Sequence, residues 1–329
     1  MKRITFIHHL AATAAALVLA GCENKDSTAA DASVLRVGFF PNITHAQGVI
    51  GYQETQTKGA EGFFEKATGA KIEWYPFNAG PSAVEALLAG TVDVTYVGTN
   101  PPLNGYTRTK GADIRILACA ARGGAALVIQ RGSGLKAPAD FRGKKIATPQ
   151  LGNTQDVAAR AWLHAGGLEI TTSGGDASVI PTQNPDQLDL FKTKQLDAVW
   201  TVEPWVSRLE LDADADLVLE QKEVVTTLMA TSVKSFETKR ELLKRFLAGH
   251  EELTKKIVAE PDWAKPLVSA GIAKAIGKPI PPPLLDHAWP RLTFTTEIKV
   301  EDISTIQHDA KAVGLVPEEA DLGKLFVKP

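Results

Sequence analysis

Residues 80–102 read GPSAVEALLAGTVDVTYVGTNPP, and they predict two segments of regular structure in close succession. Pro81 suits the first turn of a helix, and the apolar residues after it recur at helical spacing until Gly90, which is typical of a helix end. Residues 92–97 are then mostly β-branched or aromatic, too few for a helix, and lead into a glycine. This pattern predicts a buried strand of an α/β sheet.

A second helix is predicted to begin directly beyond this strand, at Pro101. Thr99 or Asn100 would then be its N-cap residue. The first backbone N–H groups of a helix have no partner within that helix, so they face whatever lies beyond the end of the strand. A helix start placed over a strand end is a geometry that binds small anions.

A similar unit recurs 104 residues later in the chain. The aligned pairs are Asp93 with Asp197, Pro81 with Pro185, Val84 with Leu188, Leu87 with Phe191 and Val92 with Leu196. Glu203 therefore falls where Thr99 falls in the first copy. Two copies predict two α/β lobes that present loops at the carboxyl ends of their strands, with a ligand between them. The alternative is that any two such units of an α/β protein look alike.

An export signal is predicted at the start of the chain. Two basic residues precede an apolar run at residues 10–20 that is too short to span a bilayer. The run leads to LAGC, ending at Cys22, which resembles the lipobox of bacterial lipoproteins, whose cysteine becomes the lipidated first residue of the mature protein. We expect a signal peptide over residues 1–22, a flexible tether over residues 23–33, and a lipid anchor to a bacterial membrane, in the periplasm or at the cell surface. The alternative is a soluble secreted protein that is cleaved nearby.

Charge and cysteine content narrow the class of protein. Without the two basic residues of the leader, 34 basic residues face 38 acidic ones, a formal charge of about −4, so nucleic acid is not expected as a partner. Cys119 is the only cysteine besides Cys22, and its apolar neighbours predict a buried side chain. Roughly 300 mature residues exceed the usual size of a domain with a single core, which favours two lobes.

The order of the predicted strands follows this two-lobe scheme. Strands are predicted at residues 35–40, 71–77, 92–97 and 114–121 in the first lobe, and at residues 126–130, 145–149, 177–182 and 197–201 in the second. Their alternation with helices predicts mainly parallel sheets flanked by helices. The first lobe would contain residues 34–121 and 225–329, the second residues 122–224, with a hinge between the lobes. The last helices, including one at residues 320–326, are expected to wrap the first lobe.

Six segments in the same order resemble the substrate-binding proteins of ABC importers. They are the export signal, LRVGFF, AVEALLAGTVDVTYVG, DFRGKKIATP, GNTQDVAARAWL and DAVWTVEPW. The similarity covers most of residues 34–329, and the nearest group is the one for aliphatic sulfonates, taurine, nitrate and bicarbonate. The resemblance implies a two-lobed periplasmic-binding-protein fold of type II that closes on its ligand, with a separate permease and its ATPase as partners. Three segments match no single ligand subgroup: Gly123-Gly124, Asn100-Pro101-Pro102 and Asn153-Thr154-Gln155.

Neutral hydrogen-bond donors at helix starts form the predicted ligand site. A sulfonate stays ionised at physiological pH, so backbone N–H groups and neutral side chains suffice to bind it without an arginine clamp. The predicted contacts of this kind are Asn42, His45, Ser82, Thr99, Asn100, Asn153, Thr154 and Gln155. For each residue the alternative is a capping role alone, and for His45 a structural hydrogen bond.

Two further predicted contacts are of a different kind. Glu203 would repel an anion, so either its carboxylate turns away to solvent or the ligand carries an amine as well, as taurine does. Trp205 is predicted to form an apolar wall or a cation–π face, whereas Trp200 lies within a strand and is expected in the core. The alternatives are a surface acid for Glu203 and ordinary packing for Trp205.

The sequence favours a binding protein over an enzyme. It contains no G-x-S-x-G, no G-x-x-x-x-G-K-[ST] and no complete G-x-G-x-x-G motif, and its seven histidines are scattered. We expect no catalytic residue, no cofactor, no metal site and a monomeric protein. The predicted function is capture of a small organic anion, an aliphatic sulfonate such as taurine, for an ABC permease. The alternatives are a binding protein for nitrate, bicarbonate or a pyrimidine precursor, and an enzyme on the same fold.

Overall fold

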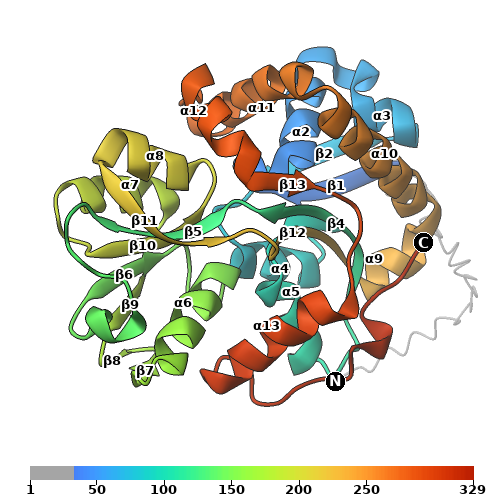
Figure 1. Ribbon diagram of the computed structural model, residues 1–329. Coiled ribbons are helices and arrows are strands. Elements are labelled where there is room, and N and C mark those ends of the chain that lie inside the picture. The colour runs from blue at the N-terminus through green and yellow to red at the C-terminus, as the bar shows by residue number, and fades with distance from the viewer. Residues whose placement is uncertain (1–32) are drawn as a thin grey trace, which may run out of the picture.

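Two lobes, each built on its own β-sheet, make up the described part of the chain (Figure 1). The computed structural model describes residues 33–329, so the predicted signal peptide with Cys22, and the tether up to residue 32, lie outside the described residues. The first sheet contains, in spatial order, β13 (Leu292–Phe294), β4 (Ile114–Gly123), β12 (Val225–Ser232), β3 (Val94–Val97), β1 (Val34–Phe39) and β2 (Lys71–Pro76). The second contains β11 (Ala215–Gln221), β5 (Ala125–Gln130), β10 (Ala198–Val202), β6 (Lys145–Thr148) and β9 (Ser178–Pro181), and a separate hairpin joins β7 (Ile170–Thr171) to β8 (Gly174–Gly175).

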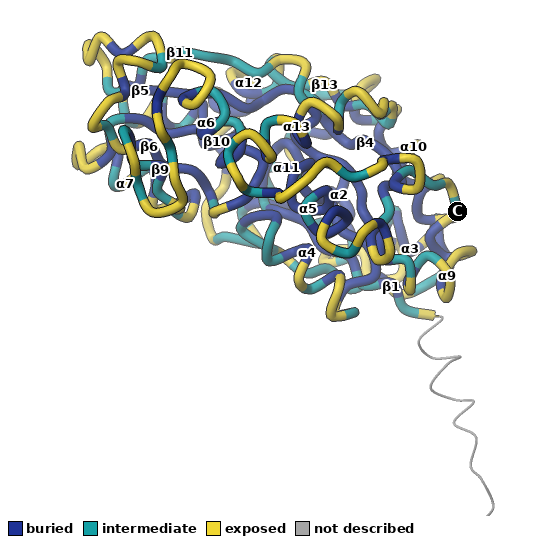
Figure 2. The backbone as a smooth tube through the Cα atoms, turned by 90° about the horizontal axis from the view of Figure 1, so that it is seen from below, coloured by how far each residue is buried: buried dark blue, intermediate teal, exposed yellow. Residues whose placement is uncertain are grey.

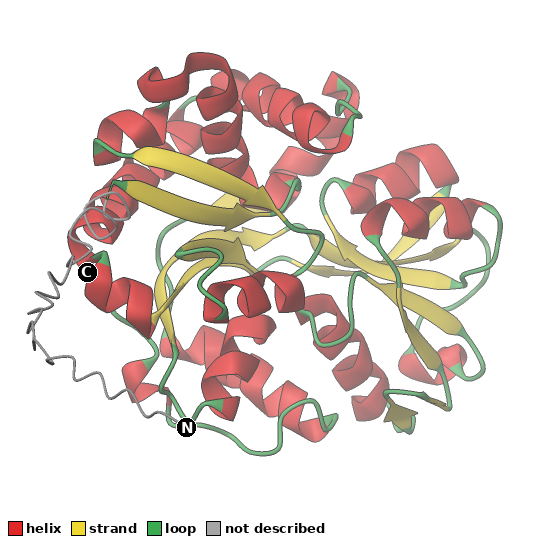
Figure 3. Cartoon of the chain, turned by 180° about the vertical axis from the view of Figure 1, so that it is seen from behind, coloured by secondary structure: helices red, strands yellow, loops and turns green. Residues whose placement is uncertain are grey.

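Helices cover both faces of each sheet (Figure 3). One face of the first sheet packs against α2 (Ala46–Lys58), α3 (Phe63–Thr68), α10 (Arg240–Ala259), α11 (Pro261–Ile276) and α12 (Pro282–Ala288), and the other against α4 (Gly80–Leu88), α5 (Asn100–Arg108) and α13 (Val300–Ala312). In the second lobe α6 (Thr154–Ala165) and η3 (Pro138–Phe141) cover one face, and α7 (Asn184–Lys192) and α8 (Trp205–Ala213) the other. Shorter helices are η1 (Ile43–His45), η2 (Gly59–Glu61), α9 (Val233–Thr238), η4 (Trp289–Arg291) and η5 (Leu322–Lys324).

The strand directions correct one expectation from the sequence. The predicted two-lobed α/β fold is confirmed, and β1 runs parallel to β2 and β3, as β6 does to β9 and β10. However, β12 is antiparallel to β3 and β4, and β5 is antiparallel to β10 and β11. The sheets are mixed because β5 and β12 enter their lobes directly from the other lobe, without the crossover helix that a parallel neighbour requires.

The chain crosses between the lobes twice, from β4 to β5 and from β11 to β12. These crossings support the predicted division at residues 122–224, which stays a prediction. The C-terminal helices α12 and α13 pack on the first lobe as expected, and they also reach the second lobe, where α12 packs against α8 and α13 against α6. The helix predicted at residues 320–326 is reduced to the short turn η5. The end of the chain therefore bridges the lobes.

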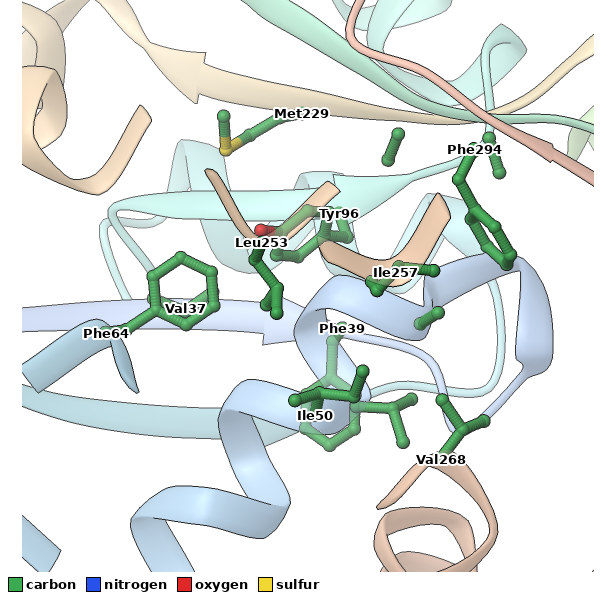
Figure 4. Packing of buried hydrophobic residues seen from close by; sticks show 14 of the residues in the cluster. Val37, Phe39, Ile50, Phe64, Tyr96, Met229, Leu253, Ile257, Val268 and Phe294 are labelled. Carbon is green, nitrogen blue, oxygen red and sulfur yellow. The ribbon is translucent and has the colours of Figure 1, made fainter. Parts of the chain in front are cut away.

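A large apolar core fixes the first lobe. Burial runs through the interior of both lobes, and the exposed stretches gather at the outer turns (Figure 2). In the first lobe Phe39, Phe64 and Tyr96 lie between the sheet and the surrounding helices (Figure 4). The rings of Phe64 and Phe246 stack with their centroids 4.4 Å apart. Each fully buried side chain of this size contributes roughly 1.5–3 kcal/mol to folding, so the lobe is a rigid support for the strand ends.

The unit repeated in the sequence is also repeated in space. Asp93, before β3, accepts the backbone N–H of Arg36 on β1 at 2.9 Å, and Asp197, before β10, accepts that of Lys145 on β6 at 2.9 Å. The backbone N–H of each aspartate donates in return to the carbonyl of the same partner, at 2.8 and 3.0 Å. The two lobes therefore join their central parallel strands in the same way, as expected of two copies of one unit.

Candidate ligand-binding site

A small cavity lies between the lobes, at the carboxyl ends of their parallel strands. It is lined by Phe40, Asn42, Thr44, His45, Asn78, Ala79, Gly80, Gly98 and Pro101 of the first lobe, by Pro149, Asn153, Thr154, Gln155, Asn184 and Val202 of the second, and by Thr226 on β12. About 20 Å³ is open to the centre of a water molecule, which is room for one or two waters. A larger ligand can therefore enter only when the lobes move apart.

Helix starts from both lobes meet at this cavity. In the first lobe η1 follows β1, and α4 begins at Gly80. In the second, α6 begins at Thr154 and α7 begins at Asn184. The free N–H groups of a first turn carry partial positive charge, so these starts favour an anion. The geometry follows from the local sequence, in which a strand ends and a polar residue or proline opens the next helix.

His45 is held as a neutral side chain at the edge of the cavity. Its ring stacks on Phe40 with the centroids 4.3 Å apart, and its Nδ1 accepts the backbone N–H of Phe40 at 3.3 Å. Complete burial lowers the pKa of His45 to about 3. Because Nδ1 accepts a hydrogen bond, the proton of the neutral ring is on Nε2. His45 is therefore a neutral N–H donor at physiological pH.

The start of α6 is organised by its own side chains. The side-chain oxygen of Asn153 accepts the backbone N–H of Asp156 at 2.8 Å and caps the helix. Its amide group donates to Gln155 at 3.2 Å. Asp156 also pairs with the fully buried Arg160, which fixes the orientation of the helix. The first N–H groups of α6 are thus placed firmly at the cavity.

Hydrogen bonds join the lobes around the cavity. The backbone N–H of Asn100 donates to Oγ1 of Thr154 at 3.1 Å, and the amide group of Asn100 donates to the carbonyl of Gly152 at 2.8 Å. On the opposite side, Nε1 of Trp205 donates to the side-chain oxygen of Asn42 at 3.0 Å. These contacts require both lobes, so they form only when the lobes are together.

The lining of the cavity carries no formal charge. None of its sixteen residues is Asp, Glu, Lys or Arg, and the single histidine is neutral. The polar groups among them are amides, hydroxyls and the imidazole N–H. The site can therefore surround an anion with neutral donors, and it offers no carboxylate to a cation.

A sequence profile of the NMT1-like family matches residues 28–271. The chain belongs to the NMT1-like family. Among curated proteins it is similar to the taurine-binding periplasmic protein of Escherichia coli (strain K12), with 27% identity over 214 residues that cover 63% of this chain. The match covers 64% of that relative, just under two thirds of its length.

Solved structures share the fold of this NMT1-like protein. The alkanesulfonate-binding protein SsuA from Xanthomonas axonopodis pv. citri, bound to MOPS, has a TM-score of 0.71 and 20% identity, over 90% of this chain and 99% of that one. The periplasmic nitrate-binding protein NrtA from Synechocystis PCC 6803 has a TM-score of 0.59 and 18% identity, over 72% of this chain and 66% of that one. The matches confirm the predicted resemblance to substrate-binding proteins of the sulfonate, taurine and nitrate group.

The cavity of the NMT1-like protein brings together half of the residues that the sequence singled out. Asn42, His45, Asn153, Thr154 and Gln155 line it. The other five, Ser82, Thr99, Asn100, Glu203 and Trp205, are not among the lining residues. Contact of the lining residues with a ligand stays a prediction.

The polar residues outside the lining hold the two lobes and the strands in place. Thr99 does not cap α5, because its hydroxyl donates to the carbonyl of Val225 at 2.6 Å. Ser82 forms a hydrogen bond with Gln150 of the second lobe, with 3.2 Å between its oxygen and the amide nitrogen. Asn100 and Trp205 make the interlobe bonds described above. These side chains do not line the cavity, but their hydrogen bonds hold the segments that form it.

Glu203 corrects the sequence prediction most clearly. Its carboxylate neither turns to solvent nor lines the cavity, because it is fully buried and accepts from the hydroxyl and backbone N–H of Ser207 and from Arg291. Burial raises the pKa of Glu203 above its ordinary value, although the Arg291 charge opposes this. Arg291 lies 88 positions later in the chain, so the sequence could not reveal this partner. Glu203 is thus held by partners within the protein, and its contact with the amine of a ligand stays a prediction.

Several lining residues were missed in the sequence. Asn78 and Asn184 approach each other across the lobes, with 3.4 Å from the backbone nitrogen of Asn184 to the side-chain oxygen of Asn78. Asn78 lies two residues before α4 and Asn184 is the first residue of α7, and each helix follows a strand, which is the rule that identified Asn153. Thr44 lies at a helix start that the sequence indicates, whereas Thr226 carries no comparable signal.

Within residues 33–329 no helix is long and apolar enough to cross a membrane, and no group of three or more His, Cys, Asp or Glu side chains is placed to hold a metal ion.

Two buried histidines make stability depend on pH. Burial lowers the pKa of His45 to about 3 and that of His250 to about 4, from an ordinary value of 6.5. The unfolded chain takes up these protons below pH 6.5 and the folded chain does not, so stability should fall as pH drops from 6.5 towards 4. The slope contributed by each histidine approaches about 1.4 kcal/mol per pH unit. Urea unfolding at pH 7.5, 6 and 5 measures how the free energy of unfolding changes with pH. In His45→Gln the unfolded chain takes up about one proton fewer, so this free energy should fall less steeply between pH 6 and 5. The same slope in the variant and the wild type would contradict this account.

Proposed function

We propose that this protein captures a small aliphatic sulfonate in the cavity between its lobes and delivers it to an ABC permease. The observation that supports this most is the lining itself, in which neutral donors at helix starts of both lobes surround one space without any charged side chain. An anion removed from water needs such donors, and a carboxylate in their place would repel it. Of the similar proteins named above, one is a taurine-binding and one an alkanesulfonate-binding protein, and the third is a nitrate-binding protein.

The lining contains hydrogen-bond donors for the head group of a sulfonate and apolar side chains for its alkyl chain. The imidazole N–H of His45 and the first N–H groups of α6 suit the three oxygens of the head group. Phe40, Pro101 and Val202 are apolar lining residues that suit a short alkyl chain. Because a sulfonate is ionised at every physiological pH, these neutral donors need no proton transfer to bind it.

We propose a simple alkanesulfonate over taurine as the preferred ligand. The ammonium of taurine would find no carboxylate among the lining residues, and Glu203 is already paired with Arg291. Transferring an ammonium from water without a charged partner is costly. The similarity to a taurine-binding relative does not decide between these ligands, because a single carboxylate could bind the amine, and similarity over the whole chain does not show whether that one residue is present.

A role in binding, and not in catalysis, fits the same lining. His45 is its only side chain that could exchange a proton readily, and a pKa of about 3 leaves it too weak a base for general base catalysis near pH 7. We infer that the protein releases its ligand unchanged. A separate permease and ATPase would then supply the transport energy.

A thermal-shift screen tests the proposed function. The candidates are ethanesulfonate, taurine, nitrate, bicarbonate and a pyrimidine precursor. Ethanesulfonate at 100 times its dissociation constant should add about 2.7 kcal/mol of stability, and no product should form on long incubation. A shift with nitrate or bicarbonate alone would replace the sulfonate by a smaller oxyanion, and turnover of any candidate would contradict a binding protein.

We also propose that the mature chain is anchored to a membrane through a lipid on Cys22. The supporting pattern is the apolar run that leads to LAGC at residues 19–22. Cys22→Ser should therefore move the protein out of the membrane fraction or leave an unprocessed precursor, as seen by fractionation and mass measurement. Unchanged processing and membrane association in this variant would show that Cys22 is not the anchor.

A further inference from the structure

One arginine of the first lobe faces three carboxylates of the second. Arg291 ends η4, directly before β13. Its guanidinium donates to Glu203 at 3.1 Å and to the two oxygens of Glu210 at 2.6 and 3.1 Å, and Glu220 lies 3.9 Å away. The three acids come from the end of β10, from α8 and from β11. We call these four side chains the interlobe cluster.

The interlobe cluster is largely removed from water. The side chain of Glu203 has no exposed surface, and those of Arg291, Glu210 and Glu220 are 15%, 16% and 19% exposed. Charges this deeply placed are poorly screened. Without Arg291 the three carboxylates would repel one another, and Glu203 would lose the cation that compensates its burial. The attraction between Arg291 and these carboxylates therefore draws the second lobe towards the C-terminal segment of the first lobe.

The interlobe cluster lies beside one of the chain crossings. Leu292 pairs with Gly123, the last residue of β4. The backbone N–H of Glu203 donates to the carbonyl of Gly124 at 2.8 Å. A side chain on Gly123 would meet the carbonyl oxygen of Arg291 at 2.3 Å, so these backbones are in close contact. Arg291 thus adds a non-covalent connection between the lobes, close to the place where the chain crosses from β4 to β5.

Glu203 links the interlobe cluster to the cavity. Its carbonyl accepts the backbone N–H of Ile43 at 3.2 Å. Ile43 begins η1, which carries the lining residues Thr44 and His45. On the other side, Val202 directly precedes Glu203 and lines the cavity itself. A shift of Glu203 would therefore displace lining residues of both lobes.

We propose that Arg291 is a positioning residue of the ligand site, which sets the angle between the lobes through Glu203 and Glu210. The binding part of this inference rests on the proposed function of the cavity. When Arg291 is lost, the lobes adopt a more open average arrangement. The ligand must then supply the free energy of closing, so its affinity falls in proportion to the loss of the closed population.

Three full-length variants test this role against the wild type. Arg291→Gln removes the charge, and Arg291→Lys keeps the charge without the two parallel hydrogen bonds. Arg131→Gln is the matched control, because the Arg131 side chain is 58% exposed and its ion pairs among residues 33–329 are with Asp214 and Asp216 of its own lobe. Small-angle scattering without ligand should give a larger radius of gyration for Arg291→Gln than for wild type or Arg131→Gln. Calorimetric titration with ethanesulfonate should show at least tenfold weaker binding for Arg291→Gln and an intermediate loss for Arg291→Lys.

Folded Arg291→Gln protein with a wild-type radius of gyration overturns the inference, and so does an affinity for ethanesulfonate within twofold of wild type. If Arg291→Gln does not fold, Glu210→Gln decides by the same two measurements, because Glu210 is partly exposed and its loss leaves Glu203 paired. The scattering comparison needs no ligand. Wild-type protein that binds no sulfonate would therefore refute the proposed function while the role of Arg291 in lobe positioning is still decided.

Discussion

Gly98→Ala should weaken ligand binding at least tenfold while leaving the free energy of unfolding nearly unchanged. Gly98 directly follows the strand β3 of the first lobe and faces Thr154 at the start of α6. An added Cβ would lie 2.6 Å from Oγ1 of Thr154, which is too close, and its other contacts within 4 Å are at 3.5 Å or more. The methyl group therefore obstructs closure of the lobes without disturbing either lobe alone. A tenfold loss corresponds to about 1.4 kcal/mol of binding free energy.

The control for Gly98→Ala removes the obstructing atom. In Gly98→Ala with Thr154→Ala, the nearest remaining contact of the new methyl group is the Cβ of residue 154 at 3.5 Å, an ordinary distance. Closure should return in this double variant, as contraction on ligand binding measured by small-angle scattering. Affinity should recover only in part, because the hydroxyl of Thr154 is lost. Wild-type affinity in Gly98→Ala alone would mean that ligand binding does not require the closed arrangement.

Asp93→Ala should destabilise the protein by roughly 3–5 kcal/mol, the cost of removing one partner from a buried ion pair. The Asp93 side chain is 2% exposed and accepts from both Arg36 and Lys239, whose own side chain is 5% exposed. Its loss leaves the buried Lys239 ammonium without this carboxylate. Calorimetric unfolding of the variant and the wild type measures the difference.

The internal repeat supplies a matched control for Asp93→Ala. Asp197 occupies the same place in the second lobe, but its side chain is 35% exposed and its partner Lys144 is 40% exposed. Asp197→Ala loses the same kind of backbone hydrogen bond and only a screened ion pair, so it should cost about 1 kcal/mol. Equal losses in the two variants would show that burial of the ion pair is not what stabilises the first copy.

The internal repeat and the helix starts beyond the strand ends could be predicted, because each is indicated by a pattern within a short stretch of sequence. Asp93 and Asp197 mark equivalent positions at a spacing visible in the chain, and a strand followed by a polar residue and a helix identified Asn42, His45 and Asn153. These features depend on residues a few positions apart. The two-lobed architecture and five of the sixteen lining residues follow from them.

Contacts between distant segments could not be predicted. The sequence does not show that Arg291 reaches Glu203, because the partners belong to different lobes and no local pattern connects them. It also does not show that the hydroxyl of Thr99 bonds to Val225 instead of capping α5. The antiparallel insertion of β12 depends in the same way on where the chain re-enters the first lobe. In each case the structure depends on a contact with a segment far away in the sequence, and the residues nearby do not indicate that contact.

A titration of ethanesulfonate and of its neutral isostere ethanesulfonamide tests the central claim most directly. The claim is that neutral donors at helix starts bind a small sulfonate anion between two closing lobes. Isothermal calorimetry should show one ethanesulfonate per chain, and at least tenfold weaker binding of the sulfonamide, because hydrogen bonds to a charged acceptor are the stronger ones. Equal affinity for the two compounds, or no binding of ethanesulfonate at millimolar concentration, would contradict the account.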